Sequence, residues 1–162
     1  MKIGIIADTH DDVDNLKAAL ETLQAEGVTT LLHCGDVCGP HMIRALAGFD
    51  VWIVQGNMDG DVKLAAAAEE TFGRGRLAWL QRPALDGMSV AMIHGDNEEA
   101  LRALIASGEY AYVLHGHTHK RRDQMVGRTR VINPGALGGK RPQRYSFCIL
   151  DPKTGETRFF EL

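Results

Sequence analysis

The sequence predicts an α/β protein in which helices flank a sandwich of two β-sheets. The first observation is a β-α-β-α-β order of apolar patterns at the start of the chain, which is typical of a parallel sheet with right-handed crossovers. The second is a series of short strand-like segments, separated by Gly and Pro turns, later in the chain. That series is typical of antiparallel pairing, so we expect a second sheet to pack against the first.

Buried strands alternate with helices in the first part of the chain. The run from Ile3 to Ile6 is short and β-branched, which is typical of a strand buried on both faces. The apolar residues from Leu16 to Leu23 keep the spacing of a one-faced helix, which Asp11 or Asp12 can cap and Gly27 can end. The following segments are predicted to be a strand over Thr29–His33, a helix over Pro40–Leu46, a strand over Asp50–Val54 and a helix over Ala65–Glu70.

The second part of the chain is richer in short strands. The patterns predict one helix, over Glu98–Ser107. We expect the strands of this part to pair in antiparallel fashion and to form the second sheet. They are predicted over Leu77–Leu80, Met88–His94, Tyr110–Leu114, Gln124–Val126, Arg130–Ile132, Tyr145–Leu150 and Thr157–Phe160.

Composition bounds the class of protein. A length of 162 residues predicts a single domain over residues 1–162. The net charge of -3 gives no electrostatic case for nucleic-acid binding. No apolar run approaches the roughly 18 residues of a membrane helix, and no basic, cleavable leader opens the chain. We therefore expect a cytoplasmic protein without a membrane partner. The 3 cysteines, an odd number, predict no disulfide framework.

Five predicted strands end in side chains that can bind a metal ion. A single Asp-x-His pair, such as Asp8 with His10, is also typical of a helix cap followed by a surface histidine. Five such endings along one chain are hard to explain as surface accidents, because the ends of parallel strands meet at one edge of a sheet. The candidate ligands are Asp8, His10, Asp36, Asn57, His94, His117 and His119.

The donor types indicate a pair of divalent ions. Carboxylate, amide oxygen and imidazole suit manganese, iron, zinc, cobalt or nickel, and no thiolate is needed. The candidates are too many for one ion and enough for two that share a carboxylate. Two aspartates and a hydroxide would reduce the charge of two divalent ions to roughly +1, which suits a phosphate anion. Two ions about 3.5–4 Å apart can activate a bridging water and clamp the oxygens of a phosphate ester.

The order of these motifs resembles that of the calcineurin-like metallophosphoesterases, and most closely their small, cap-less bacterial and archaeal phosphodiesterase branch. The resemblance covers nearly the whole chain and implies a two-sheet α/β sandwich. It implies that the site holds two divalent metal ions, and we expect manganese to be the element bound. It rests on Asp8-Thr9-His10, Gly35-Asp36, Gly56-Asn57, His94-Gly95 and Gly116-His117-Thr118-His119. It also implies one metal held by Asp8, His10 and His119, another held by Asn57, His94 and His117, and Asp36 as the bridge.

Two positions depart from the pattern of the family. Met58 stands where many members have a histidine that contacts phosphate and helps the leaving group. Asp96 stands where many have the second histidine of a His-x-His motif. The family pattern also implies that the loop Asn133-Pro134-Gly135 lies beside the site.

Other polar or glycine-rich segments favour structural roles. The glycines before Lys140 follow no Walker pattern and indicate a turn between strands. The run Lys120-Arg121-Arg122 can attract an anion, but it is also typical of a solvated strand edge. His33 and His115 lie inside predicted strands and favour packing or support of the site.

Three classes of function remain open at this point. The leading hypothesis is a hydrolase of small phosphate diesters, in which a metal-bridging hydroxide attacks phosphorus and Asn57 also contacts the substrate. A phosphomonoesterase or a nuclease is the second, although a nuclease needs a basic groove that the sequence does not reveal. The third is a non-catalytic protein-interaction scaffold, as in the retromer subunit of the same fold. The sequence leaves a homo-oligomer open.

Overall fold

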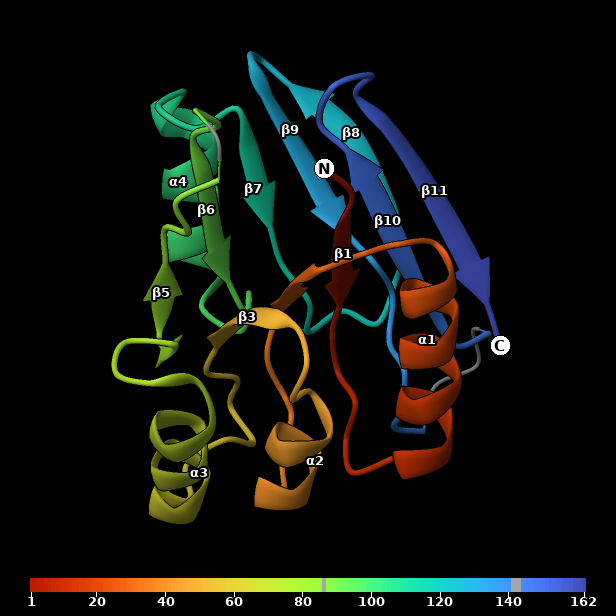
Figure 1. Cartoon of the computed structure of the whole chain (residues 1–162). Coiled ribbons are helices and arrows are strands. Elements are labelled where there is room, and N and C mark those ends of the chain that lie inside the picture. The colour runs from red at the N-terminus through yellow and green to blue at the C-terminus, as the bar shows by residue number, and fades with distance from the viewer. Residues whose placement is uncertain (86, 141–143) are drawn as a thin grey trace.

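Two β-sheets pack face to face, and helices cover the outer face of each (Figure 1). The structure is a computed structural model that describes residues 1–85, 87–140 and 144–162. The predicted α/β class, with a two-sheet sandwich flanked by helices, is confirmed. Among the described residues, none of the helices is both long and apolar enough to cross a lipid bilayer.

The first sheet contains the predicted parallel unit at its centre. Strands β1, β2 and β3 pair in parallel, with Ile3 opposite Thr30 and Thr30 opposite Asp50. The strand order is β11-β10-β1-β2-β3-β4. The bounds are β1 Ile3–Ile6, β2 Thr30–His33, β3 Asp50–Val54, β4 Leu77–Ala78, β10 Ser146–Asp151 and β11 Glu156–Glu161.

Helices α1, α2 and α3 cover the outer face of this sheet. Their apolar sides form one core cluster with Ile6, Leu31 and Ile53. The side chain of Asp12 accepts a hydrogen bond from the backbone N–H of Asn15 at 3.0 Å, as expected of the N-cap of α1. The helices span Val13–Ala25 (α1), Pro40–Ala45 (α2) and Val62–Phe72 (α3).

The second sheet has the strand order β5-β6-β7-β9-β8. Its outer face packs on helix α4, through a cluster that includes Ile93, Leu101 and Val113. Its inner face meets the first sheet through apolar side chains such as Ile5 and Met92. The bounds are β5 Leu80–Gln81, β6 Val90–Ile93, α4 Glu98–Ser107, β7 Tyr112–Leu114, β8 Arg122–Val126 and β9 Thr129–Asn133.

The prediction that the second part pairs only in antiparallel fashion is wrong. Strands β6, β7 and β9 are parallel, because β6, α4 and β7 form a further β-α-β unit. Strands β10 and β11 do pair in antiparallel fashion, but they extend the first sheet beside β1. Both sheets are therefore mixed.

The single strand predicted over Leu77–Leu80 is also wrong, because the chain changes sheets within it. Leu77 and Ala78 pair with β3 in the first sheet, whereas Leu80 pairs with Ile93 in the second. The buried side chain of Gln81 donates a hydrogen bond to the carbonyl of Ile53 at 3.3 Å and so ties the two sheets together at this crossing.

Candidate metal centre

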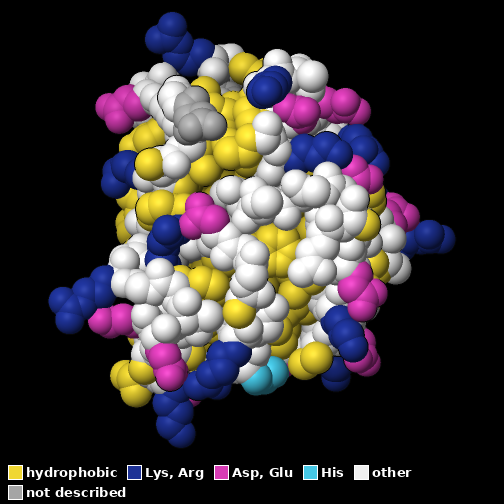
Figure 2. Space-filling view, viewed as in Figure 1, with side chains coloured by type: hydrophobic (Ala, Val, Ile, Leu, Met, Phe, Trp, Pro, Cys, Tyr) yellow, Lys and Arg dark blue, Asp and Glu magenta, His cyan; other side chains and the backbone are white. Residues whose placement is uncertain are grey.

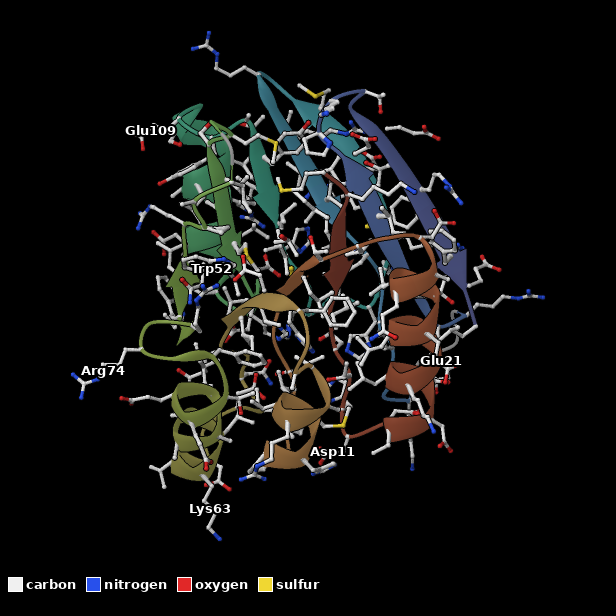
Figure 3. The ribbon with its side chains drawn as sticks, viewed as in Figure 1. Asp11, Glu21, Trp52, Lys63, Arg74 and Glu109 are labelled. Atoms are coloured by element: carbon white, nitrogen blue, oxygen red, sulfur yellow. The ribbon has the colours of Figure 1, made fainter. Side chains whose placement is uncertain are left out.

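The seven candidate ligands lie at one edge of the sandwich, where five parallel strands end. The ends of β1, β2 and β3 come from the first sheet and those of β6 and β7 from the second. Figure 3 labels Asp11 at this edge, just after the first motif and close to the start of α1. The two sheets thus contribute to one site, which neither could form alone.

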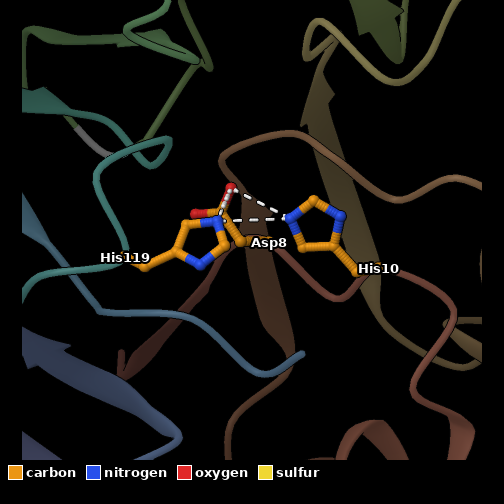
Figure 4. Close-up of side chains that lie close together, drawn as sticks. All are labelled: Asp8, His10 and His119. Atoms are coloured by element: carbon orange, nitrogen blue, oxygen red, sulfur yellow. Dashed lines mark hydrogen bonds and ion pairs between the residues drawn. The ribbon is translucent and has the colours of Figure 1, made fainter. Parts of the chain in front are cut away.

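Asp8, His10 and His119 form the first group of donors (Figure 4). The Oδ1 atom of Asp8 lies 3.4 Å from Nε2 of His119 and 3.8 Å from Nε2 of His10. The two Nε2 atoms are 3.2 Å apart. Three donor atoms that converge in this way, from loops 109 residues apart in sequence, are suited to hold one cation.

Asp36 and His94 form a second group, again with Asp8. The Oδ2 atom of Asp36 lies 3.3 Å from Nε2 of His94 and 3.6 Å from Nε2 of His10, so this oxygen lies between the two groups. The Oδ1 atom of Asn57 lies 3.1 Å from Nε2 of His94. The ring of His117 lies 5.2 Å from that of His94 between centroids. The structure therefore brings all seven candidates together.

Each of the two aspartates fixes a loop and turns one oxygen toward the histidines. Asp8 accepts a hydrogen bond from the backbone N–H of His117 through Oδ2 at 3.0 Å and, at a longer 3.3 Å, through Oδ1. Asp36 accepts one from the backbone N–H of Met58 through Oδ1 at 2.9 Å. The Oδ1 atom of Asp8 and the Oδ2 atom of Asp36 face imidazole nitrogens. These bonds hold the donor atoms in place before any ion binds.

The electrostatics of His94 indicate a site built for positive charge. Burial by itself lowers the pKa of His94, but hydrogen bonds to Asp36 and to the carbonyl of Cys34 outweigh it and raise the pKa to about 9. Burial by itself raises the pKa of the Asp36 carboxyl, but hydrogen bonds from His94 and from the backbone N–H of Met58 outweigh it and lower that pKa below its usual value. The Nδ1 atom of His94 is 2.8 Å from the Cys34 carbonyl, so it donates there and Nε2 faces the site.

The backbone of the site is strained at the candidate ligands themselves. Asp8, Asp36, His117 and His119 have positive φ angles of 51°, 55°, 67° and 57°. Non-glycine residues rarely adopt this left-handed region, and each such residue costs of order 1–3 kcal/mol unless its surroundings hold it. The candidate ligands therefore make these turns themselves.

Gly56 and Gly116 are needed for close approach. A Cβ atom on Gly56 would lie 2.2 Å from Oδ1 of Asp36, and one on Gly116 would lie 2.7 Å from Oδ2 of Asp8. Both distances are far below contact, so a side chain at either position would displace a candidate ligand.

A layer of hydrogen bonds supports the ligand loops. The buried ring of His33 contacts the hydroxyl of Thr9 through Nε2 at 3.1 Å, and its Nδ1 accepts the N–H of Gly35 at 3.1 Å. Burial, with the nearby charge of His94, lowers the pKa of His33 to about 3, so the ring is neutral. The supporting role predicted for His33 agrees with these contacts.

Asp59 is a further support of the candidate ligand loops. Its carboxylate accepts the N–H of Cys38 at 2.8 Å and that of Gly56 at 2.9 Å, and so joins the second and third ligand loops. Burial raises its pKa, in spite of these hydrogen bonds. The sequence signal was weak, because an aspartate after Gly-Asn-Met is also typical of a simple turn.

A cavity of about 310 Å³ opens over the donor atoms. Its lining includes Met58, whose side chain is 57% exposed, and the segment Gly139–Lys140. The sequence favoured a turn between strands for that segment, and the structure places it on the wall of the site. The preceding residues bind the first loop directly, since the N–H of Gly138 donates to the carbonyl of Asp8 at 2.8 Å. Asp96 is exposed and belongs to neither donor group within the described residues.

Comparisons with known proteins agree with this fold and site. The family profile of the calcineurin-like phosphoesterase superfamily domain matches residues 1–155. A phosphodiesterase of Methanocaldococcus jannaschii is 33% identical over 161 residues, which cover 98% of this chain and 97% of that protein. The solved structure of an archaeal phosphodiesterase has a TM-score of 0.90, 33% identity and 100% coverage of both chains.

More distant structures share the fold. The phosphoesterase YfcE from E. coli has a TM-score of 0.73 at 19% identity, with 99% of both chains covered. Vps29 from Entamoeba histolytica, solved in complex with zinc, has a TM-score of 0.68 at 21% identity, with 100% of this chain and 98% of that one covered. Together, the profile match and the archaeal relative show that this chain belongs to the calcineurin-like phosphoesterase superfamily. The family resemblance predicted from the five motifs is confirmed.

Proposed function

We propose that this protein is a metal-dependent phosphodiesterase that uses two divalent ions. The single observation that carries the proposal is the convergence of two donor groups around the facing oxygens of Asp8 and Asp36. A phosphodiesterase that is 33% identical over nearly its full length supports the same class of reaction.

The donor set fits such a pair of ions. We assign one ion to Asp8, His10 and His119, the other to Asn57, His94 and His117, and Asp36 to both. Oxygen and imidazole donors without thiolate suit manganese first, and zinc, iron, cobalt or nickel as alternatives.

The two ions would supply an acidified water between them and a positive clamp for the phosphate oxygens. The chain itself orients these parts. The backbone N–H groups of His117 and Met58 fix the two carboxylates, and the carbonyl of Cys34 fixes the ring of His94. Asn57 is exposed beside His94 and can donate a hydrogen bond to a phosphate oxygen through its amide.

The openness of the site favours diesters. Within the described residues, no segment forms a separate cap over the cavity. A diester carries one negative charge, which matches the net charge of roughly +1 expected for the loaded site. A monoester dianion resembles the product and is expected to bind more as an inhibitor than as a substrate.

Two other functions are weaker. Figure 2 shows lysine and arginine side chains interspersed with acidic ones on the face in view, and the net charge of -3 gives no electrostatic case for a nuclease. The likeness to Vps29 raises a scaffold role, but that likeness is one of fold. A scaffold has no need of convergent donors, and here all seven candidate ligands are present and close together.

The test is a rate comparison on purified protein that has been stripped of metal and reloaded with one metal at a time. We expect hydrolysis of bis(4-nitrophenyl) phosphate to depend on the metal and to exceed that of 4-nitrophenyl phosphate. A rate that is unaffected by chelation would reject the metal-dependent reaction. Faster turnover of the monoester with every metal would reject the diester preference.

A further inference from the structure

A second cavity lies beside the metal centre, between α4 and β8. Its volume is about 350 Å³, which is near the lower end of the 300–1,000 Å³ found for sites of small organic ligands. It borders the metal centre through His117, which lines both cavities. The space is therefore placed to receive a group attached to a phosphate held by the ions.

His115 lines this cavity and can offer it an acceptor. The residue is 3% exposed, and its Nδ1 lies 3.0 Å from the carbonyl of Gly116 and 3.3 Å from the amide nitrogen of Asn133. Because a carbonyl oxygen can only accept, we assign the ring proton to Nδ1. A neutral imidazole with its proton on Nδ1 carries a lone pair on Nε2. Among the described residues, this buried Nε2 has no hydrogen-bond partner. Such a buried acceptor is satisfied by a ligand that brings an N–H or O–H group.

The rest of the lining is suited to a flat, mostly apolar ring. Leu101 and Ile105 from α4 and Val126 from β8 supply apolar surface. Arg122 supplies a guanidinium, which stacks readily on the face of an aromatic ring. Arg102 lies at the exposed rim of the cavity, where it pairs with Glu98 at 2.9 Å.

We propose that this cavity is a substrate subsite that binds a nucleobase, or a similar flat heterocycle with an N–H donor, on the non-leaving alcohol of a phosphate diester. The inference rests on the proposed function and deepens it by naming the substrate class. The apolar walls and Arg122 hold the ring, and Nε2 of His115 accepts its N–H. The phosphate then lies over the donor atoms on the other side of His117.

The first experiment varies only the substrate. Three diesters share a 4-nitrophenol leaving group and differ in the other alcohol, which is methanol, thymidine through its 5′ oxygen, or N3-methylthymidine. We expect the thymidine ester to have the highest kcat/KM. The N3-methyl ester, which lacks the donor, is expected to be about tenfold worse because the acceptor of His115 stays unpaired. Equal values for the two thymidine esters overturn the proposal.

A pair of variants on β8 places the effect in the cavity. Val126→Trp fills the space, whereas Met125→Trp adds the same ring to the neighbouring residue, which is 57% exposed and does not line it. The readout is the kcat/KM of the thymidine ester divided by that of the methyl ester, which cancels any loss of folded or loaded enzyme. The ratio should fall about tenfold or more in Val126→Trp and stay at the parent value in Met125→Trp. The same ratio in Val126→Trp as in the parent overturns the assignment.

Binding is measured separately from hydrolysis, so that failure of the proposed subsite can be distinguished from failure of the proposed phosphodiesterase function. Thymidine 5′-monophosphate is titrated into the parent protein, and the NMR signals of the Leu101, Ile105 and Val126 methyl groups are followed. Shifts in these signals, absent with N3-methylthymidine 5′-monophosphate at the same concentration, support the subsite even if no ester is hydrolysed. Absence of shifts with the unmodified nucleotide rejects it, even if the simple diesters are hydrolysed well.

Discussion

Asp36→Asn is the substitution that tests the proposed metal centre most directly. It keeps the shape of the side chain, and an asparagine oxygen can still accept the N–H of Met58, now 2.9 Å from Oδ1. It removes the negative charge that lies 3.3 Å from Nε2 of His94 and 3.6 Å from Nε2 of His10. We therefore expect both ions to bind more weakly while the loop keeps its course.

The size of the effect can be scaled from Coulomb's law. Two unit charges about 3.5 Å apart, at an effective dielectric constant of about 20, attract by roughly 5 kcal/mol, and a divalent ion in contact with the carboxylate is attracted at least as strongly. The cost of desolvating the carboxylate offsets part of this, so a loss of about 3 kcal/mol for each ion is a reasonable expectation. That corresponds to roughly a hundredfold weaker binding of each metal, and a drop of at least about 10³-fold in kcat/KM at micromolar metal.

The assay combines metal content after dialysis with hydrolysis of bis(4-nitrophenyl) phosphate. Asp59→Asn is the matched control, because it makes the same chemical change in a nearby buried carboxylate that contacts only loop N–H groups. The control should keep two ions and lose about 1–2 kcal/mol of stability. His119→Ala should empty one site and leave the other partly filled. An Asp36→Asn protein that holds two ions and hydrolyses diesters at the parent rate would refute the bridging assignment.

Three further predictions concern protons. The thioether of Met58 cannot protonate a leaving group, so hydrolysis rates of aryl and alkyl diesters should depend steeply on the acidity of the leaving group. Met58→His should flatten that dependence. A shallow dependence in the parent that the variant leaves unchanged contradicts the prediction. Metal binding should release a proton from His94, because the pKa of that residue is raised to about 9. Metal affinity, measured by competition with a metal-binding dye, should therefore rise with pH up to about pH 9. An affinity that does not change with pH is inconsistent with this prediction. His33 is neutral when folded, with its pKa lowered to about 3 from 6.5. The unfolded chain binds its proton more readily between these values, so the contribution of His33 to stability is full above about pH 6.5 and lost as the pH falls toward 3. That contribution is on the order of 5 kcal/mol, and the pH dependence of urea unfolding of the metal-free protein should flatten in His33→Gln.

The sequence allowed the candidate site to be predicted because its motifs lie at the ends of parallel strands. An apolar run followed by Gly-Asp or His-Gly identifies such an end locally, as with Asp36 after β2 and His94 after β6. Parallel pairing then brings these ends together without any knowledge of distant contacts. Both sheets contribute such strand ends. The members of the candidate site could therefore be predicted, although the parallel pairing of β6, β7 and β9 in the second sheet was not.

Strand partners were harder to predict, because they depend on what covers each face. Strand β10 was assigned to the second sheet, yet it lies beside β1. Its run Phe147–Leu150 is apolar at every position, and both faces are buried, by the helices on one side and the second sheet on the other. A continuous apolar run favours a central strand, whereas β8, with Asp123 and Gln124 exposed, has the pattern of an edge. That contrast was present in the sequence and would have corrected the topology.

The left-handed backbone at the ligands explains why these motifs are so recognisable in a single sequence. Aspartate and histidine are among the few residue types, besides asparagine and glycine, that tolerate positive φ well. They are also the types that bind divalent ions through oxygen and imidazole. At Asp8, Asp36, His117 and His119 both demands fall on one residue, since each has a φ between 51° and 67°. Few residue types satisfy both conditions, so the motif is narrow. For the same reason, alanine at these positions changes the backbone as well as the donor, and Asp→Asn isolates the loss of charge more cleanly.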